Sequence, residues 1–177
     1  MKLNKIVLCV SLAMGVVSFA NAADIPDQGH GTVTFTGSII DAPCSIHPDS
    51  IDQTVNLGQV SDVSLSAGGT STPKFFEIVL EKCNIENKAQ TVTATFNGAT
   101  GGVNGSLGMT GTAQGASIVL TDSVGKQIKL GEKTSAQAIQ NGNNTLGFTA
   151  YLQGHGASTA IVPGDFKSVA NFTLAYQ

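Results

Sequence analysis

The sequence predicts a single all-β domain, folded as a sandwich or a barrel. Short runs rich in β-branched and aromatic residues recur along the chain, and turn-forming residues separate them. No segment has a helical period of useful length, and no internal repeat of about 20 to 50 residues is visible. The 155 residues that would follow a 22-residue leader (177 minus 22) suit one domain with its own core.

The chain begins with the features of a secretory signal. Lys2 and Lys5 supply positive charge, residues 6–19 are apolar or small, and the small-residue pattern A-N-A ends at Ala22. We predict cleavage between Ala22 and Ala23, so that residues 1–22 are removed on export. The mature chain would then carry seven Lys against twelve Asp and Glu, a net charge of −5.

Two cysteines lie in the predicted mature chain. Cys9 falls within the signal, and only three apolar residues precede it, which argues against a lipoprotein processing site. Cys44 and Cys83 form an even pair in an exported chain, which indicates one disulfide. Closing this loop would stabilise the fold by about 4 kcal/mol in the chain-entropy model. Two cysteines alone do not make a structural zinc site, which takes four ligands.

The predicted strands succeed one another between turn and loop signals. Asn-Gly pairs at Asn97, Asn104 and Asn141 supply turns. Gly-, Ser- and Thr-rich stretches over 61–72 and 98–115 read as loops. The predicted strands are 31–41, 54–60, 74–82, 91–97, 116–122, 126–130, 145–153 and 168–176.

Alternating apolar residues mark both ends of the predicted mature chain. Residues 31–37 read G-T-V-T-F-T-G, and the last ten residues read S-V-A-N-F-T-L-A-Y-Q. A period of two places alternate side chains on one face of a strand. The pattern leaves open whether these end strands pair within one chain or between successive chains.

The remaining residues offer little for catalysis or ligand binding. None of the three histidines, His30, His47 and His155, has a Ser or Cys partner at motif spacing. Asp49 and Asp52, near His47, are the only candidate metal cluster, and we predict no metal, no cofactor and no enzyme activity. An acidic chain without a basic stripe also argues against nucleic-acid binding.

Residues from 31 onward resemble the subunits of chaperone–usher pili, most closely the type 1-like fimbrial major subunits. Residues 31–44, G-T-V-T-F-T-G-S-I-I-D-A-P-C, match the pilin pattern, and Cys83 follows a strand at the spacing of the family's single disulfide. Tyr176 stands next to last in an alternating strand, as in that family. The resemblance implies an incomplete immunoglobulin-like β-sandwich that lacks its last strand, with an apolar groove beside the C-terminal strand.

The resemblance also implies how the groove is filled. In this family a periplasmic chaperone first lends a strand, and the N-terminal extension of the next subunit then replaces it, which is β-strand addition. Residues 23–36 are the expected donor extension, and residues 37–177 are the expected pilin domain. The donor residues expected to face the groove are Gly29, Gly31, Val33 and Phe35. The residues expected on the acceptor groove and chaperone-binding strand are Phe172, Leu174 and Tyr176.

The expected function is that of a structural subunit of an adhesive pilus on the bacterial cell surface. The implied partners are copies of itself, other pilin subunits, a periplasmic chaperone and an outer-membrane usher. A minor adaptor or terminator pilin is one alternative. A carbohydrate-binding fimbrial adhesin is another, but G-T-V-T-F begins within ten residues of Ala23 and leaves no room for a preceding lectin domain. Such binding would have to use loops 61–72 or 98–115.

Overall fold

The protein is described by a computed structural model that covers residues 28–86 and 90–177. The predicted signal, its cleavage point at Ala22 and Ala23, and the start of the extension lie outside these residues. The described chain comprises the segment 28–39 and a compact unit, Ile40–Gln177. None of the helices in the described ranges has the length and apolar character needed to cross a membrane.

Five strands form the larger antiparallel sheet, in the order β1-β2-β8-β5-β6. The longest strand, β8, lies at the centre and pairs with β2 on one side and β5 on the other. Alternate β8 side chains are buried, as expected when one face of a sheet packs on a core. The five strands are β1 (Ser45–Ile46), β2 (Lys74–Cys83), β5 (Ala116–Asp122), β6 (Gln127–Ile128) and β8 (Gly142–Gly154).

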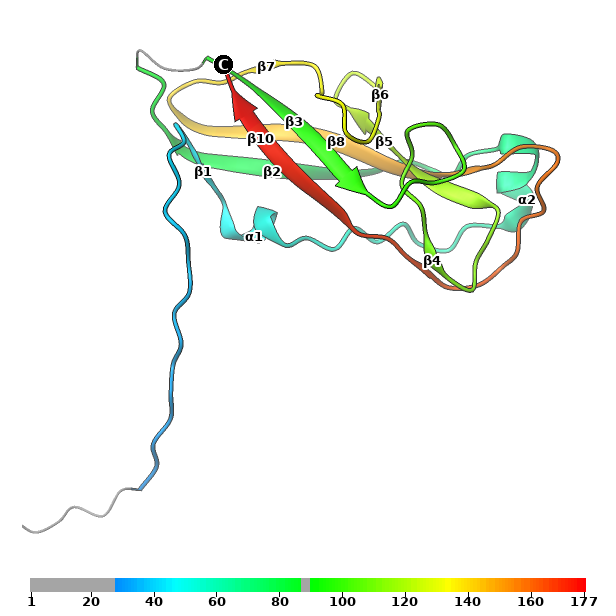
Figure 1. The fold of residues 1–177 in the computed structure, drawn as a ribbon, viewed down its shortest axis with the longest axis horizontal. Helices are drawn as coiled ribbons and strands as arrows, with labels where there is room; N and C mark the ends of the chain where they lie inside the picture. The colour runs from blue at the N-terminus through cyan, green and yellow to red at the C-terminus, as the bar shows by residue number, and fades with distance from the viewer. Residues whose placement is uncertain (1–27, 87–89) are drawn as a thin grey trace, which may run out of the picture. The chain divides into compact units, whose positions relative to one another are not determined.

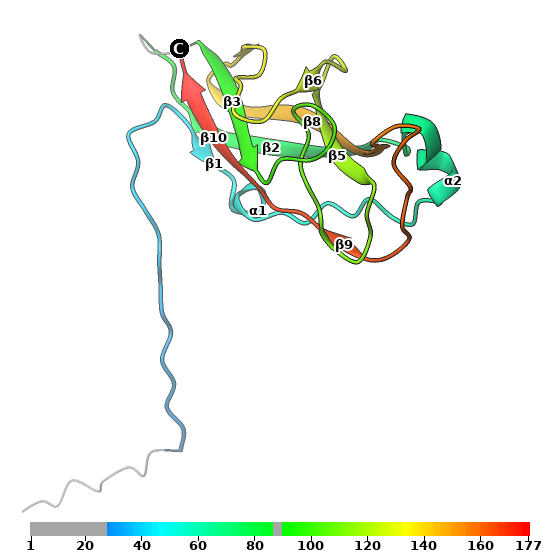
Figure 2. The same ribbon diagram turned by 45° about the vertical axis from the view of Figure 1, so that its right-hand side comes forward.

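The second sheet has the order β10-β3-β7. Its main pair is antiparallel, with Phe172 opposite Phe96. Figures 1 and 2 show β3 and β10 crossing β2 and β8, so that the two sheets form the layers of a sandwich. Its strands are β3 (Thr91–Gly98), β7 (Gln137–Ala138) and β10 (Ala170–Tyr176), and a separate ribbon joins β4 (Thr110–Gly111) to β9 (Phe166–Lys167).

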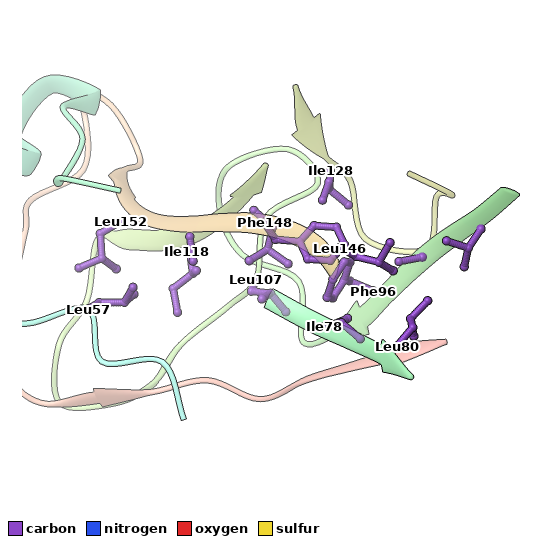
Figure 3. Packing of buried hydrophobic residues seen from close by; sticks show 14 of the residues in the cluster. Leu57, Ile78, Leu80, Phe96, Leu107, Ile118, Ile128, Leu146, Phe148 and Leu152 are labelled. Carbon is purple, nitrogen blue, oxygen red and sulfur yellow. The ribbon is translucent and has the colours of Figure 1, made fainter. Parts of the chain in front are cut away.

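The core lies between the two sheets and is organised around aromatic rings. Phe148 on β8 is fully buried, and its ring lies 5.2 Å from that of Phe96, centroid to centroid, in an edge-to-face arrangement. Phe76 on β2 lies 5.5 Å from Phe148. Aliphatic side chains such as Leu107 and Ile118 extend this cluster along the sandwich (Figure 3). The predicted all-β, open immunoglobulin-like sandwich is confirmed.

The chain between β6 and β7 closes one side of the sandwich. It passes from the larger sheet to the smaller one and covers the free edge of β3. The Thr134 amide donates to the Ala94 carbonyl at 2.8 Å, and the Thr134 hydroxyl accepts from the Ala94 amide at 2.9 Å. The Gly131 amide donates to the Phe96 carbonyl at 2.8 Å. The edge of β3 is therefore paired, whereas β10 forms the opposite edge of this sheet.

Two predicted strands are not formed. Residues 28–43 contain no strand or helix, and neither do residues 53–60, although both ranges alternate in sequence. A strand requires backbone pairing with a neighbouring strand, and neither segment belongs to a sheet of the described residues, although the Gln53 side chain donates to the Glu77 carbonyl of β2 at 2.7 Å. Short helices that the sequence did not predict flank residues 53–60: α1 (Pro48–Ile51), α2 (Asp62–Leu65) and the 3₁₀ turn η1 (Ser66–Gly68).

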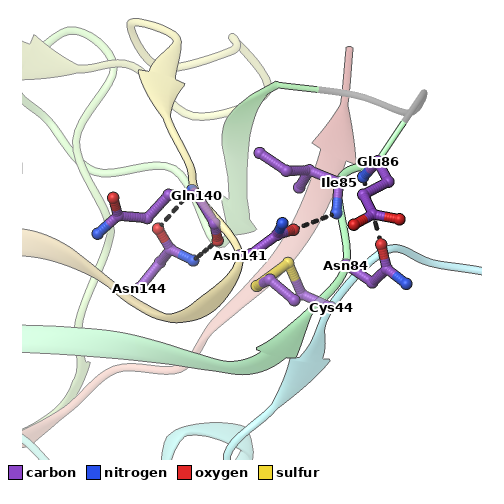
Figure 4. The surroundings of a disulfide bond; sticks show 8 residues. Cys44, Asn84, Ile85, Glu86, Gln140, Asn141 and Asn144 are labelled. Atoms are coloured by element: carbon purple, nitrogen blue, oxygen red, sulfur yellow. Dashed lines mark hydrogen bonds between the residues drawn. A yellow bond between two sulfur atoms is a disulfide. The ribbon is translucent and has the colours of Figure 1, made fainter.

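The predicted disulfide between Cys44 and Cys83 is present and joins the chain before β1 to the end of β2. Polar contacts surround it (Figure 4). The Asn141 side-chain oxygen accepts from the Ile85 amide at 2.8 Å, and the Asn84 amide donates to the Pro43 carbonyl at 2.9 Å. These contacts fix the start of the compact unit against the end of β2.

Candidate functional site

The outer edge of β10 is the open edge of the sandwich, because β10 pairs only with β3 among the described strands. The Gln177 and Thr91 backbones exchange two hydrogen bonds of 2.9 Å each. In an antiparallel ladder such bonded pairs recur at every second residue. The amides and carbonyls of Phe172, Leu174 and Tyr176 therefore point away from β3, toward the open edge.

An apolar groove of about 1140 Å³ opens beside the start of β10. One wall is the chain from Ile161 through β9 to Phe172, and the other is the irregular segment 51–60 between α1 and α2. The connection between α1 and α2 can be followed along this side of the molecule in Figure 1. Core side chains form the floor: the partly buried Phe76 and the buried Phe96, Leu107, Ile118 and Leu152.

The three predicted acceptor residues lie on one face of β10 and pack, half-buried, against the core. Phe172 lines the groove, with its ring 6.3 Å from that of Phe96. Leu174 and Tyr176 lie further along the strand, beyond the groove lining. Burial raises the pKa of the Tyr176 phenol above its ordinary value of 10.0. The residues with open-edge backbone groups are thus the ones whose side chains face the core.

The N-terminal segment carries exposed apolar side chains at alternate positions. Val33 is 74% exposed and Phe35 is 90% exposed. The alternation continues through Gly37 to Ile39, which is 104% exposed. The predicted donor range ends at residue 36 and does not include Ile39. Gly37 occupies the intervening position in the same phase, so the period of two extends to Ile39.

The other candidates have structural roles in the compact unit. The His47 side chain accepts from the Asp49 amide at 3.3 Å and caps the start of α1. Nowhere in residues 28–86 and 90–177 do three or more His, Cys, Asp or Glu side chains gather as a metal site would require. His155 contacts Ser117, which is buried beneath the loop that follows β3.

Comparisons with known proteins agree with this geometry. A family model described as fimbrial protein matches residues 33–177. The chain is 59% identical to the Fimbria A protein of Serratia marcescens and 54% identical to the Major MR/P fimbria protein of Proteus mirabilis, with 100% of each chain covered. A solved chaperone–usher pilus structure that addresses rod uncoiling superposes with a TM-score of 0.74 at 37% identity, covering 85% of this chain and 97% of that one. This chain belongs to the family of fimbrial proteins.

Proposed function

We propose that this protein is a structural subunit of a pilus shaft on the bacterial surface and that it polymerises by donor-strand exchange. One observation carries the proposal: a strand edge with unpaired backbone groups lies beside an apolar groove that opens onto the core. Such an edge favours pairing with another chain. The names of the relatives, a major fimbria protein and a pilus rod, support a shaft subunit rather than an adaptor or terminator.

The occupant that we propose for the groove is the N-terminal segment of a second copy. Its alternating side chains Val33, Phe35 and Ile39 would enter the groove, and its backbone would pair with β10 at Phe172 and Leu174. Gly37 lies between these apolar positions, where the absence of a side chain permits close approach of two backbones. We therefore extend the proposed donor from 23–36 to 23–39, which ends where the compact unit begins.

Burial of apolar donor side chains and new backbone hydrogen bonds favour the exchange, whereas ordering of the donor backbone opposes it. Burying an exposed Val, Phe or Ile side chain contributes roughly 1.5–3 kcal/mol each. Each new ladder hydrogen bond adds about 0.5–1.5 kcal/mol net. Ordering the backbone of each donor residue costs about 1–2 kcal/mol. Loss of one apolar side chain removes roughly 1.5–3 kcal/mol of this burial, so each of the three should weaken the exchange strongly.

A periplasmic chaperone would cover the groove before assembly, and an outer-membrane usher would then receive the subunit. An uncovered groove exposes apolar surface and a free edge, and both promote aggregation in water. The same geometry gives the protein a scaffold role in an adhesive fimbria, and we expect it to have no enzyme activity and to need no cofactor.

Charge substitutions on the two faces of the donor test the proposal. Val33→Asp or Phe35→Asp should abolish fibre formation, because each places a carboxylate in an apolar groove. Thr34→Asp is the matched control, since it adds the same charge to the face that points away. Electron microscopy and sedimentation of assembled material report the outcome. Fibres from the Val33→Asp and Phe35→Asp chains in wild-type yield would refute the donor assignment.

A further inference from the structure

The loop that follows β3 supplies part of the groove. After Gly98 the chain turns back toward β5. Leu107 pairs with Ile118 of β5 as a single antiparallel bridge at the side of the larger sheet. The Leu107 amide donates to the Ile118 carbonyl at 2.8 Å, and the Ile118 amide donates to the Leu107 carbonyl at 2.9 Å. The Leu107 side chain is 3% exposed and forms part of the groove floor (Figure 3). The position of this loop therefore decides the shape of the groove.

A polar cluster holds the same loop on the other face of β5. Ser117 alternates with the core-facing Ala116 and Ile118, and it is completely buried. Its hydroxyl oxygen accepts from the Gly102 amide at 2.9 Å and lies 2.6 Å from Nε2 of His155. The Gly102 amide can only donate, and the imidazole tautomer decides which of the Ser117 hydroxyl and Nε2 donates in the second contact.

Close packing keeps this cluster in one arrangement. A side chain at Gly101 would bring a Cβ within 2.3 Å of the Ser117 hydroxyl oxygen. A Cβ at Gly102 would lie 2.5 Å from the imidazole ring of His155. The His155 amide also donates to the Gly115 carbonyl at 2.9 Å, which ties the end of β8 to the start of β5. The loop glycines are therefore required by neighbouring side chains, not only by turns.

We propose that Ser117 and His155 are positioning residues for the acceptor groove. Through Gly102 they clamp the loop around the edge of β5, and the clamp holds Leu107 on the groove floor, where the donor strand would pack. The inference rests on the proposed function, because the groove has a ligand only if a donor strand enters it. Neither residue lines the groove itself, so the effect on the donor passes through the loop.

A second hydroxyl pair on the same strand provides a matched control. Thr121 lies on the same face of β5 as Ser117 and is also buried, and its hydroxyl contacts that of Thr149 on β8. Neither hydroxyl of this pair forms a hydrogen bond with the loop that carries Leu107. Loss of either hydroxyl removes a buried hydrogen bond from the same sheet face, but only Ser117 connects to the groove. A role in stability alone predicts the same behaviour for both sites.

The test measures dissociation of a fluorescent donor peptide, residues 23–39, from the chain beginning at Ala23 with Phe35→Asp in its own extension. Ser117→Ala should accelerate dissociation about tenfold, which corresponds to about 1.4 kcal/mol. Thr121→Val should leave the rate unchanged while it lowers the urea midpoint of unfolding by a similar amount. His155→Gln keeps a hydrogen-bonding group near the position of Nε2 and should give a smaller acceleration than Ser117→Ala.

The outcomes separate the inference from the proposed function. If the Phe35→Asp chain with an intact cluster fails to bind the peptide, the donor-strand proposal falls and this inference falls with it. If that chain binds, but Ser117→Ala and Thr121→Val release the peptide at the same rate, the cluster only stabilises the fold and the inference is wrong. Should Ser117→Ala fail to fold, His155→Ala removes the same contact from the other side, and unchanged dissociation from the folded His155→Ala chain would refute the inference.

Discussion

Replacing Phe172 by Ala should lower both the stability of the fold and the affinity for a donor strand. The two losses of free energy should be similar in size. Burial of a complete Phe side chain is worth about 3–5 kcal/mol in truncation experiments. Phe172 is half-buried in the free chain, where it packs on Phe96 and lines the groove. We therefore expect Phe172→Ala to lower the free energy of unfolding by roughly 1.5–2.5 kcal/mol, about half of that range.

The exposed half of Phe172 is the part that a donor strand would cover. Its loss should weaken binding of the donor peptide 23–39 by a similar roughly 1.5–2.5 kcal/mol, or about 10- to 70-fold. Urea unfolding and peptide titration measure the two parts separately. Phe75→Ala is the control, since Phe75 is 64% exposed and, as the neighbour of core-facing Phe76, points away from the core. Unchanged peptide affinity in Phe172→Ala, with reduced stability, would refute the placement of the donor beside β10.

Three further predictions concern stability. Lys82→Gly should raise the free energy of unfolding by about 0.5–1 kcal/mol, measured as a higher urea midpoint. Lys82 adopts φ +53°, a conformation that glycine tolerates better. Asp122→Ala should lower the free energy of unfolding by about 1–3 kcal/mol, since the Asp122 carboxylate accepts from the Val124 and Lys126 amides in the β5–β6 turn. Asp122→Asn keeps an acceptor oxygen and should lose less stability than Asp122→Ala. The raised pKa of Tyr176 means that the native state holds the phenolic proton more tightly than the unfolded chain. This contribution should be complete below pH 10.0 and decline as pH rises through the raised pKa, and comparison of urea midpoints with those of Tyr176→Phe isolates it.

The sequence predicted the paired strands well and the unpaired segments poorly. The predicted strand 116–122 coincides with β5, and 168–176 contains β10. Both are rich in strand-forming residues and both are paired: β5 lies between β8 and β6, and β10 pairs with β3. Residues 54–60 show the same alternation but form no strand, since they are not paired with any strand of the described residues. Local pattern reports which residues suit a strand, whereas the presence of a partner is a tertiary property.

The clamp around Leu107 could not have been predicted from the sequence. Its members come from the loop after β3, from β5 and from the end of β8, and no spacing rule links Gly102, Ser117 and His155. The glycines of this loop predicted turns, and Gly105 does adopt a positive φ of 74°. Gly101 and Gly102 instead make room for side chains that arrive from distant strands, which only the assembled sandwich reveals.

Three alternating apolar segments lack a partner on at least one edge: residues 33–39, residues 53–57 and β10. Two of them border the groove, which Leu57 and Phe172 both line. The third exposes Val33, Phe35 and Ile39, the apolar side chains that such a groove would bury. A sandwich that is complete within one chain would not account for alternating apolar residues in all three segments. Their coexistence is explained if the missing strand is supplied between copies, because the sequence then encodes both the vacancy and the strand that fills it.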